Sequence, residues 1–88
     1  MEKDNIELYT YLVFMLGQKG VSQRRIAEAS GKTPAMVNYV IRGKRRCRSV
    51  ESVLMGLLGV NSWYEVLHSA HRFQMRFVDH GGGESNVG

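Results

Sequence analysis

The sequence has little cysteine and proline and no long hydrophobic run. Cys47 is its one cysteine and Pro34 its one proline among 88 residues. A lone cysteine cannot form a disulfide within the chain, which is typical of proteins from a reducing compartment. The longest apolar stretch, residues 8–16, is about half of the roughly 20 residues that a membrane span requires, and residues 1–4 lack the basic character of a secretory signal. We therefore expect a cytoplasmic protein without a membrane segment.

The sequence also lacks the residue groupings on which enzymes and metal sites depend. His68 and His71 are three positions apart, but no cysteine or carboxylate cluster accompanies them as further ligands. No serine, histidine and aspartate pattern indicates a nucleophile, and residues 81–83 form a glycine-rich tail rather than a phosphate-binding loop. We therefore expect neither an enzyme nor a cofactor, and no small-molecule ligand is indicated.

Acidic residues are scarce in the middle of the chain. From Lys19 to Arg48, nine lysine and arginine residues stand against the single acid Glu28, which gives this segment a charge of +8. The whole chain carries +4, so the remainder carries −4. A basic segment of this kind is typical of a surface that binds a polyanion. Charge by itself does not separate DNA from RNA or from an anionic lipid surface.

Hydrophobic periodicity predicts five helices and no strand. The predicted helices cover approximately residues 4–18, 23–29, 34–42, 49–58 and 63–77. Asp4, Ser22, Thr33 and Ser62 are the predicted N-caps, because their side-chain oxygens can accept from backbone N–H groups of the first turn. Asp4 and Ser62 are each followed three residues later by glutamate, as in a capping box. The expected fold class is all-α, in one compact domain.

The C-terminal end differs in composition from the rest of the chain. Residues 79–88 are rich in glycine and show no hydrophobic periodicity. Such a segment cannot bury enough apolar surface to offset the entropy lost on ordering. We therefore predict a domain over residues 1–78, including its C-terminal helix, and a disordered tail over 79–88.

The second and third predicted helices are separated by a short turn that contains Gly31. Glycine tolerates the unusual backbone conformation that such a turn requires. Ala27 supplies a small residue where the two helices cross, and Val37 and Val40 can dock one side of the third helix. Two short helices joined in this way are the local signature of a helix-turn-helix, whose second helix enters the major groove of DNA.

Residues 21–44, VSQRRIAEASGKTPAMVNYVIRGK, resemble the helix-turn-helix of the lambda repressor and Cro family. The resemblance extends in helix order from about residue 4 to 67, where a Leu-Gly-Val step precedes a Ser-Trp helix start as in small phage regulators. It implies a compact five-helix, lambda-repressor-like domain from a bacteriophage or prophage, acting in the bacterial cytoplasm. In that family the residue matching Gln23 contacts a DNA phosphate, and the glycine matching Gly43 ends the recognition helix.

The resemblance also implies which residues face the bases. Family members often carry glutamines at the start of the recognition helix, whereas this chain has Pro34, Ala35 and Met36, which offer apolar contacts to thymine methyl groups. Hydrogen-bonded contacts then fall to the polar residues further along the helix. For Met36 and Tyr39, packing against the protein is the alternative. The predicted base-contacting residues are Thr33, Pro34, Ala35, Met36, Asn38, Tyr39 and Arg42.

Most of the basic residues flank the predicted recognition helix rather than lie on it. Contacts from such residues to phosphates set orientation and affinity without carrying sequence information, and they make binding strongly dependent on salt. The predicted phosphate-contacting residues are Ser22, Gln23, Arg24, Lys32, Lys44, Arg45, Arg46 and Arg48.

The first predicted helix is apolar over more than one side, which predicts either burial against several helices or a subunit contact. A single recognition helix contacts few base pairs, whereas a two-fold dimer contacts two half-sites. We therefore expect a homodimer. Its predicted interface residues are Leu8, Leu12, Met15, Trp63, Leu67, Ala70, Phe73 and Phe77.

These observations predict a sequence-specific transcriptional regulator that binds double-stranded DNA. A phage or prophage repressor is expected, because so short a chain has no evident effector domain and can act by occluding a promoter. It would bind a palindromic operator as a dimer through residues 34–42. One alternative is a helix-turn-helix antitoxin or accessory protein whose main role is to bind a partner protein. Another is an RNA-binding or nonspecific nucleoid protein.

Overall fold

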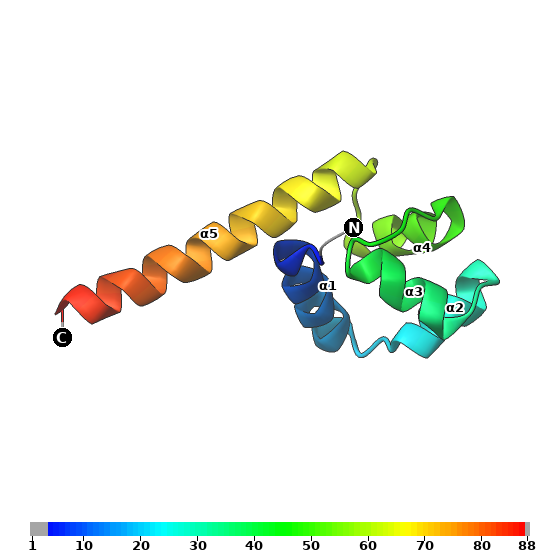
Figure 1. Ribbon diagram of the computed structural model, residues 1–88, viewed down its shortest axis with the longest axis horizontal. Helices are drawn as coiled ribbons and strands as arrows, with labels where there is room; N and C mark the ends of the chain where they lie inside the picture. The colour runs from blue at the N-terminus through cyan, green and yellow to red at the C-terminus, as the bar shows by residue number, and fades with distance from the viewer. Residues whose placement is uncertain (1–3, 88) are drawn as a thin grey trace.

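The computed structural model describes the backbone of residues 4–87 and the side chains of residues 4–76. All regular structure in that range is helical, which confirms the predicted all-α class. The helices are α1 (Ile6–Lys19), α2 (Gln23–Ser30), α3 (Pro34–Ile41), α4 (Arg48–Leu58) and α5 (Trp63–Val87). Figure 1 shows α1 to α4 gathered into one body, with α5 beginning against this body and extending away from it. None of the described helices combines the length and apolar character needed to cross a membrane.

Three of the predicted N-caps are confirmed. The hydroxyl oxygens of Ser22, Thr33 and Ser62 each accept a hydrogen bond from the backbone N–H three residues later, at 3.1–3.2 Å. Pro34 follows Thr33 at the first position of α3, where its missing N–H leaves no hydrogen bond unmade. The short helices α2 and α3 therefore have sharply defined starts.

The start of α1 differs from the prediction. Asn5 rather than Asp4 is its N-cap, and the Asn5 Oδ1 atom accepts from the backbone N–H of Leu8 at 3.1 Å. The prediction of Asp4 as the cap is wrong because its carboxylate binds Arg42, at the end of α3, instead. Since Asn5 and Asp4 are both good capping residues, local sequence does not separate them.

The core draws buried side chains from every helix. Its members are Leu8, Leu12, Leu16, Ile26, Ala27, Val37, Val40, Ile41, Val50, Leu54, Trp63, Val66 and Ala70. Fully burying one such leucine, isoleucine or valine contributes about 1.5–3 kcal/mol relative to leaving it exposed. Ala27, Val37 and Val40 are almost completely buried, as their predicted packing roles require, and α2 and α3 contact each other.

This core corrects half of the predicted dimer interface. Leu8, Leu12, Trp63 and Ala70 are buried within one chain, so they are not available to a second copy. The first helix is apolar over more than one side because α1 packs against both α3 and α5. Of the remaining predicted interface residues, Met15 and Phe73 are half-buried and Leu67 is exposed, whereas the side chain of Phe77 lies outside the described residues.

Helix α5 is longer than predicted. Its backbone is helical to Val87, whereas the sequence predicts an end near residue 77 and disorder over 79–88. No proline follows Pro34, so nothing blocks continuation of the helix sterically. Glycine in a helix costs about 1 kcal/mol relative to alanine, which opposes a stable helix across residues 81–83. The domain boundary at residue 78 stays a prediction, and Gly88 lies outside the described residues.

Candidate nucleic-acid interface

Helices α2 and α3 pack on each other across a three-residue turn, residues 31–33. Gly31 adopts the left-handed conformation, with φ of 72°, and ends α2. The backbone N–H of Lys32 then donates to the carbonyl oxygen of Ala27 at 3.0 Å, which keeps the turn short. The next residue, Thr33, is the N-cap of α3, so this short turn restricts how α2 and α3 are oriented relative to each other.

Helix α3 has one buried and one accessible side. Val37, Val40 and Ile41 are almost completely buried, and they hold the helix on the core. The accessible side carries exposed Pro34 and Ala35, which the sequence predicts to contact bases. Thr33 is exposed as well, but its hydroxyl oxygen already serves the cap. This side is therefore apolar at its start and polar further along.

Two predicted base-contacting residues, Met36 and Tyr39, differ in how much of the side chain is exposed. Met36 is half-buried and packs against the core, so part of its apolar surface is already used internally. Tyr39 is 41% exposed, and the Arg45 guanidinium carbon lies 5.7 Å from the centre of its ring. A cation at that distance from an aromatic face is attracted to the ring. Tyr39 and Arg45 thus form a unit on the accessible side of α3.

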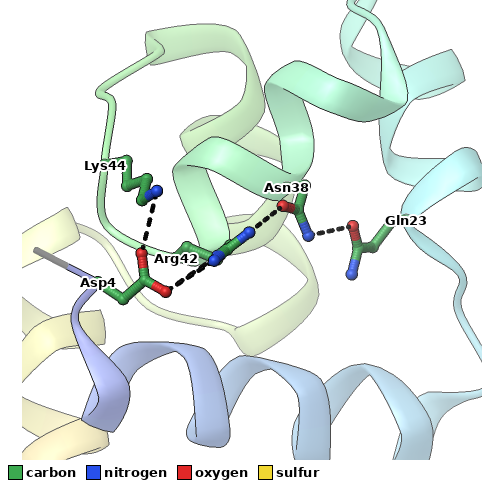
Figure 2. Close-up of polar contacts among 5 residues, drawn as sticks. All are labelled: Asp4, Gln23, Asn38, Arg42 and Lys44. Atoms are coloured by element: carbon green, nitrogen blue, oxygen red, sulfur yellow. Dashed lines mark hydrogen bonds and ion pairs between the residues drawn. The ribbon is translucent and has the colours of Figure 1, made fainter.

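A chain of polar contacts runs across the same side and joins α2, α3 and the segment before α1 (Figure 2). The Asn38 Nδ2 atom donates to Gln23 Oε1 at 3.3 Å, and Arg42 Nη1 donates to Asn38 Oδ1 at 3.4 Å. Arg42 Nε and Nη2 donate to Asp4 Oδ2 at 3.2 and 2.8 Å. The Lys44 Nζ atom lies 3.5 Å from Asp4 Oδ1. The structure thus links three predicted site residues, Gln23, Asn38 and Arg42, in one series of contacts. At its end, Arg42 and the predicted phosphate-contacting residue Lys44 bind the carboxylate of Asp4, which was not a predicted site residue.

The charged groups of Asp4 and Arg42 in this series of contacts stabilise each other. Hydrogen bonds from Arg42, together with its positive charge, lower the pKa of Asp4 below its ordinary value. The same hydrogen bonds raise the pKa of Arg42. Asp4 therefore stays ionised throughout the neutral range, and one negative charge lies within the basic surface.

A second carboxylate that sequence reasoning missed holds Arg46. Glu51 is only 6% exposed, and its carboxylate accepts from Arg46 Nε at 2.6 Å, from Arg46 Nη2 at 3.1 Å and from the backbone N–H of Cys47 at 3.2 Å. The hydrogen bonds to Glu51 raise the pKa of Arg46. The available signal was an acidic residue in the first turn of α4, where the helix dipole favours negative charge. Removing Arg46 would therefore disturb the fold as well as any phosphate contact.

The loop from α3 to α4, residues 42–47, is rich in basic residues. Met36, Lys44, Arg45 and Arg46 line a hollow of about 370 Å³. A hydrogen bond with Ser49 is the main cause that lowers the pKa of the Cys47 thiol, and the charge of Lys32 adds to the effect.

The remaining predicted phosphate-contacting residues divide into two groups. Ser22 is exposed and caps α2, while Gln23 is half-buried and bonded to Asn38. The other group consists of exposed cations that form no ion pair with any residue from 4 to 76. These cations are Arg24, Lys32, Arg45 and Arg48.

The histidines have structural partners. The His71 Nδ1 atom lies 3.2 Å from Glu7 Oε2, and the ring of His68 stacks on that of Tyr64 at 6.1 Å between centres. Over the part of the chain that the structure describes, no three histidine, cysteine, aspartate or glutamate side chains gather as metal ligands.

Comparison with protein-family models, with curated proteins and with solved structures finds no match.

Proposed function

We propose that the chain is a sequence-specific DNA-binding transcriptional regulator in which α2 and α3 act as a helix-turn-helix of the lambda repressor and Cro type. The observation that carries the proposal is the division of α3 into a buried apolar side and an accessible polar side. This accessible side is flanked by exposed cations that form no ion pair with any residue from 4 to 76. A helix with these two sides can enter the major groove while its inner side stays on the core.

The cations and the helix have separate roles in this proposal. Arg24, Lys32, Arg45 and Arg48 bind phosphates and set the position of the protein on the duplex. The start of α3 makes apolar contacts with thymine methyl groups, as predicted. Hydrogen-bonded recognition falls to Tyr39 and to Asn38, whose amide retains one lone pair and one hydrogen beyond its contacts with Gln23 and Arg42.

We propose for Arg42 a different role from the base contact that the sequence predicts. Its Nε, Nη1 and Nη2 atoms all donate within the protein, to Asp4 and Asn38. Arg42 is therefore proposed as a positioning residue that fixes which end of the Asn38 amide points toward Gln23. An asparagine held in one orientation matches adenine, which presents one donor and one acceptor in the major groove.

The regulator is proposed to act in the bacterial cytoplasm as a phage or prophage repressor, by occluding a promoter as a homodimer.

The proposed contact between the two copies uses apolar surface on α1 and α5. Large apolar side chains remain exposed there, among them Val13, Phe14, Leu67 and Met75. The Phe14 ring lies 5.1 Å from that of Phe73, so α1 and α5 share one aromatic surface. This surface replaces the corrected interface as the proposed contact between copies. Sedimentation should give a dimer on DNA, and a monomer both free and bound would contradict this part.

Selection from a random DNA library tests the function directly. We expect enrichment of one two-fold symmetric site whose half-sites lie about 10 base pairs apart, one helical turn, because two copies of α3 must face the same side of the duplex. The enriched site should hold the protein against a large excess of random DNA and of RNA. Binding to all sequences alike would contradict the proposal and favour a nonspecific nucleoid protein.

Asn38→Ala should remove the preference at one position of each half-site. Loss of a paired contact with a base costs about 1–3 kcal/mol, so affinity for the selected site should fall about 5- to 150-fold for each half-site, with random DNA bound as before. Asn61→Ala is the matched control, since Asn61 is exposed in the turn between α4 and α5. Quantitative binding to duplexes substituted at each position measures the effect. An equal loss on every duplex would show that Asn38 contacts no base.

A further inference from the structure

We propose that Asp4 is a specificity-determining residue of the DNA interface, which withholds Arg42 and Lys44 from DNA phosphates and so lowers affinity for DNA of arbitrary sequence. The inference rests on the proposed function and adds a residue that lies outside the helix-turn-helix. Asp4 belongs to the segment before α1 and contacts α3 and the loop after it (Figure 2).

The position of Asp4 is fixed by its neighbour in the chain. The backbone N–H of Asn5 donates to the carbonyl oxygen of Arg42 at 2.7 Å, and the Asn5 side chain caps α1. Gly43 lies so close that a Cβ atom on it would come 2.7 Å from Asn5 Cβ. The segment before α1 is thus packed against the end of α3, which places the backbone of Asp4 beside Arg42.

The contact between Asp4 and Arg42 has the chemistry of a phosphate contact. A guanidinium group binds carboxylate and phosphate oxygens through the same N–H donors. Here Arg42 Nε and Nη2 both donate to Asp4 Oδ2, at 3.2 and 2.8 Å, while the Lys44 ammonium lies 3.5 Å from Oδ1. A DNA phosphate approaching Arg42 must displace a carboxylate that is already in place. Asp4 therefore occupies the position that a phosphate would take.

Asp4 acts on affinity and on specificity by two routes. Phosphate contacts are available on any DNA sequence, so two fewer of them weaken binding to all DNA, including DNA of arbitrary sequence. The second route passes through Asn38. Asp4 holds Arg42 where its Nη1 atom donates to Asn38 Oδ1, and this contact keeps the Asn38 amide in the orientation proposed for base recognition. Specificity is the ratio of the affinities for operator and for random DNA, so it depends on this orientation, and an Arg42 drawn to a phosphate would lower the ratio.

Asp4→Asn tests the inference on a short duplex of random sequence and on the selected operator. With Arg42 and Lys44 released, affinity for random DNA at about 0.1 M salt should rise about three- to tenfold, and the dependence of log K on log salt should steepen by about one to two units. The preference for the operator should fall. Glu7→Gln is the matched control, because it removes the same charge from a carboxylate on α1 that pairs with His71 instead. It should change binding to random DNA less than about twofold.

Asp4→Glu keeps the charge and should bind like the wild type. Because Asp4 precedes the capping residue Asn5 and lies outside α1, its loss should leave the helix in place, and melting followed by circular dichroism verifies this. If Asp4→Asn is unfolded, Asp4→Ser removes the same charge with a smaller side chain. The inference alone would be overturned by one result: the wild type binds DNA, but Asp4→Asn and Asp4→Ser bind random DNA no more tightly than Glu7→Gln does. Wild type that binds no duplex would overturn the proposed function and the inference together.

Discussion

Replacing Lys32, Arg45 and Arg48 together by glutamine should weaken binding to random-sequence duplex DNA about 10²- to 10³-fold at about 0.1 M salt. These residues are exposed and form no ion pair with the described part of the chain, so their charges are available to phosphates. Each lost phosphate contact should also flatten the salt dependence by about one unit, or about three in total. Titration of a labelled duplex at several salt concentrations measures both effects.

The matched control removes the same charge from elsewhere on the molecule. Lys19, Arg72 and Arg76 are exposed on α1 and α5, and replacing them by glutamine lowers the net charge from +4 to +1, as the first set does. The control should keep most of its affinity, because separated surface charges are largely screened beyond about 10 Å at this salt concentration. Equal losses in both variants would mean that net charge rather than the surface around α3 determines DNA binding.

Gly43→Ala should be the most damaging single substitution at a turn. Gly43 has φ of +78°, and a Cβ atom there would lie 2.7 Å from Asn5 Cβ, which is too close for any two such atoms. The left-handed conformation costs alanine about 1–2 kcal/mol, and forcing the neighbouring segments apart costs about 1–3 kcal/mol more. We expect the free energy of unfolding to fall by about 2–5 kcal/mol, measured by urea denaturation.

Gly31→Ala separates these two contributions. Gly31 has φ of +72°, but a Cβ atom on it meets nothing within 4 Å, so this variant has only the conformational cost of about 1–2 kcal/mol. Equal losses at Gly31 and Gly43 would show that the segment before α1 moves away from α3 at little cost. In the expected case, Gly43→Ala also separates Asp4 from Arg42 and should raise affinity for random DNA, as Asp4→Asn does.

Local features of the sequence predicted the helices well. Ser22, Thr33 and Ser62 cap the helices they were expected to cap, because an N-cap hydrogen bond spans only three residues. The apolar spacing along α3 likewise predicted which side is buried, since helical periodicity alone decides which residues share a face. The prediction was wrong at Asp4, whose partner Arg42 lies 38 residues further along the chain.

Helix α1 is a second case in which local sequence did not determine a residue's partner. Its apolar residues were compatible with a subunit contact or with burial inside one chain, and only the packing of α1 against α3 and α5 decided for burial. The hydrophobic effect favours removal of an apolar side chain from water, but because it is non-directional it does not determine which surface covers that side chain. Leu8 and Leu12 therefore belong to the core, and the exposed apolar side chains nearby replace them in the proposed contact between copies.

The sequence by itself determined the helical class, the caps at Ser22, Thr33 and Ser62, the turn at Gly31 and the concentration of positive charge around α3. These properties depend on residues close together in the chain and on their periodicity. Tertiary structure alone decided which of those charges are available. Asp4 binds Arg42 and Lys44, and buried Glu51 binds Arg46, whereas Arg24, Lys32, Arg45 and Arg48 form no ion pair within residues 4–76. Such pairing depends on which segments the core brings within about 4 Å, the range over which two charged groups bind each other.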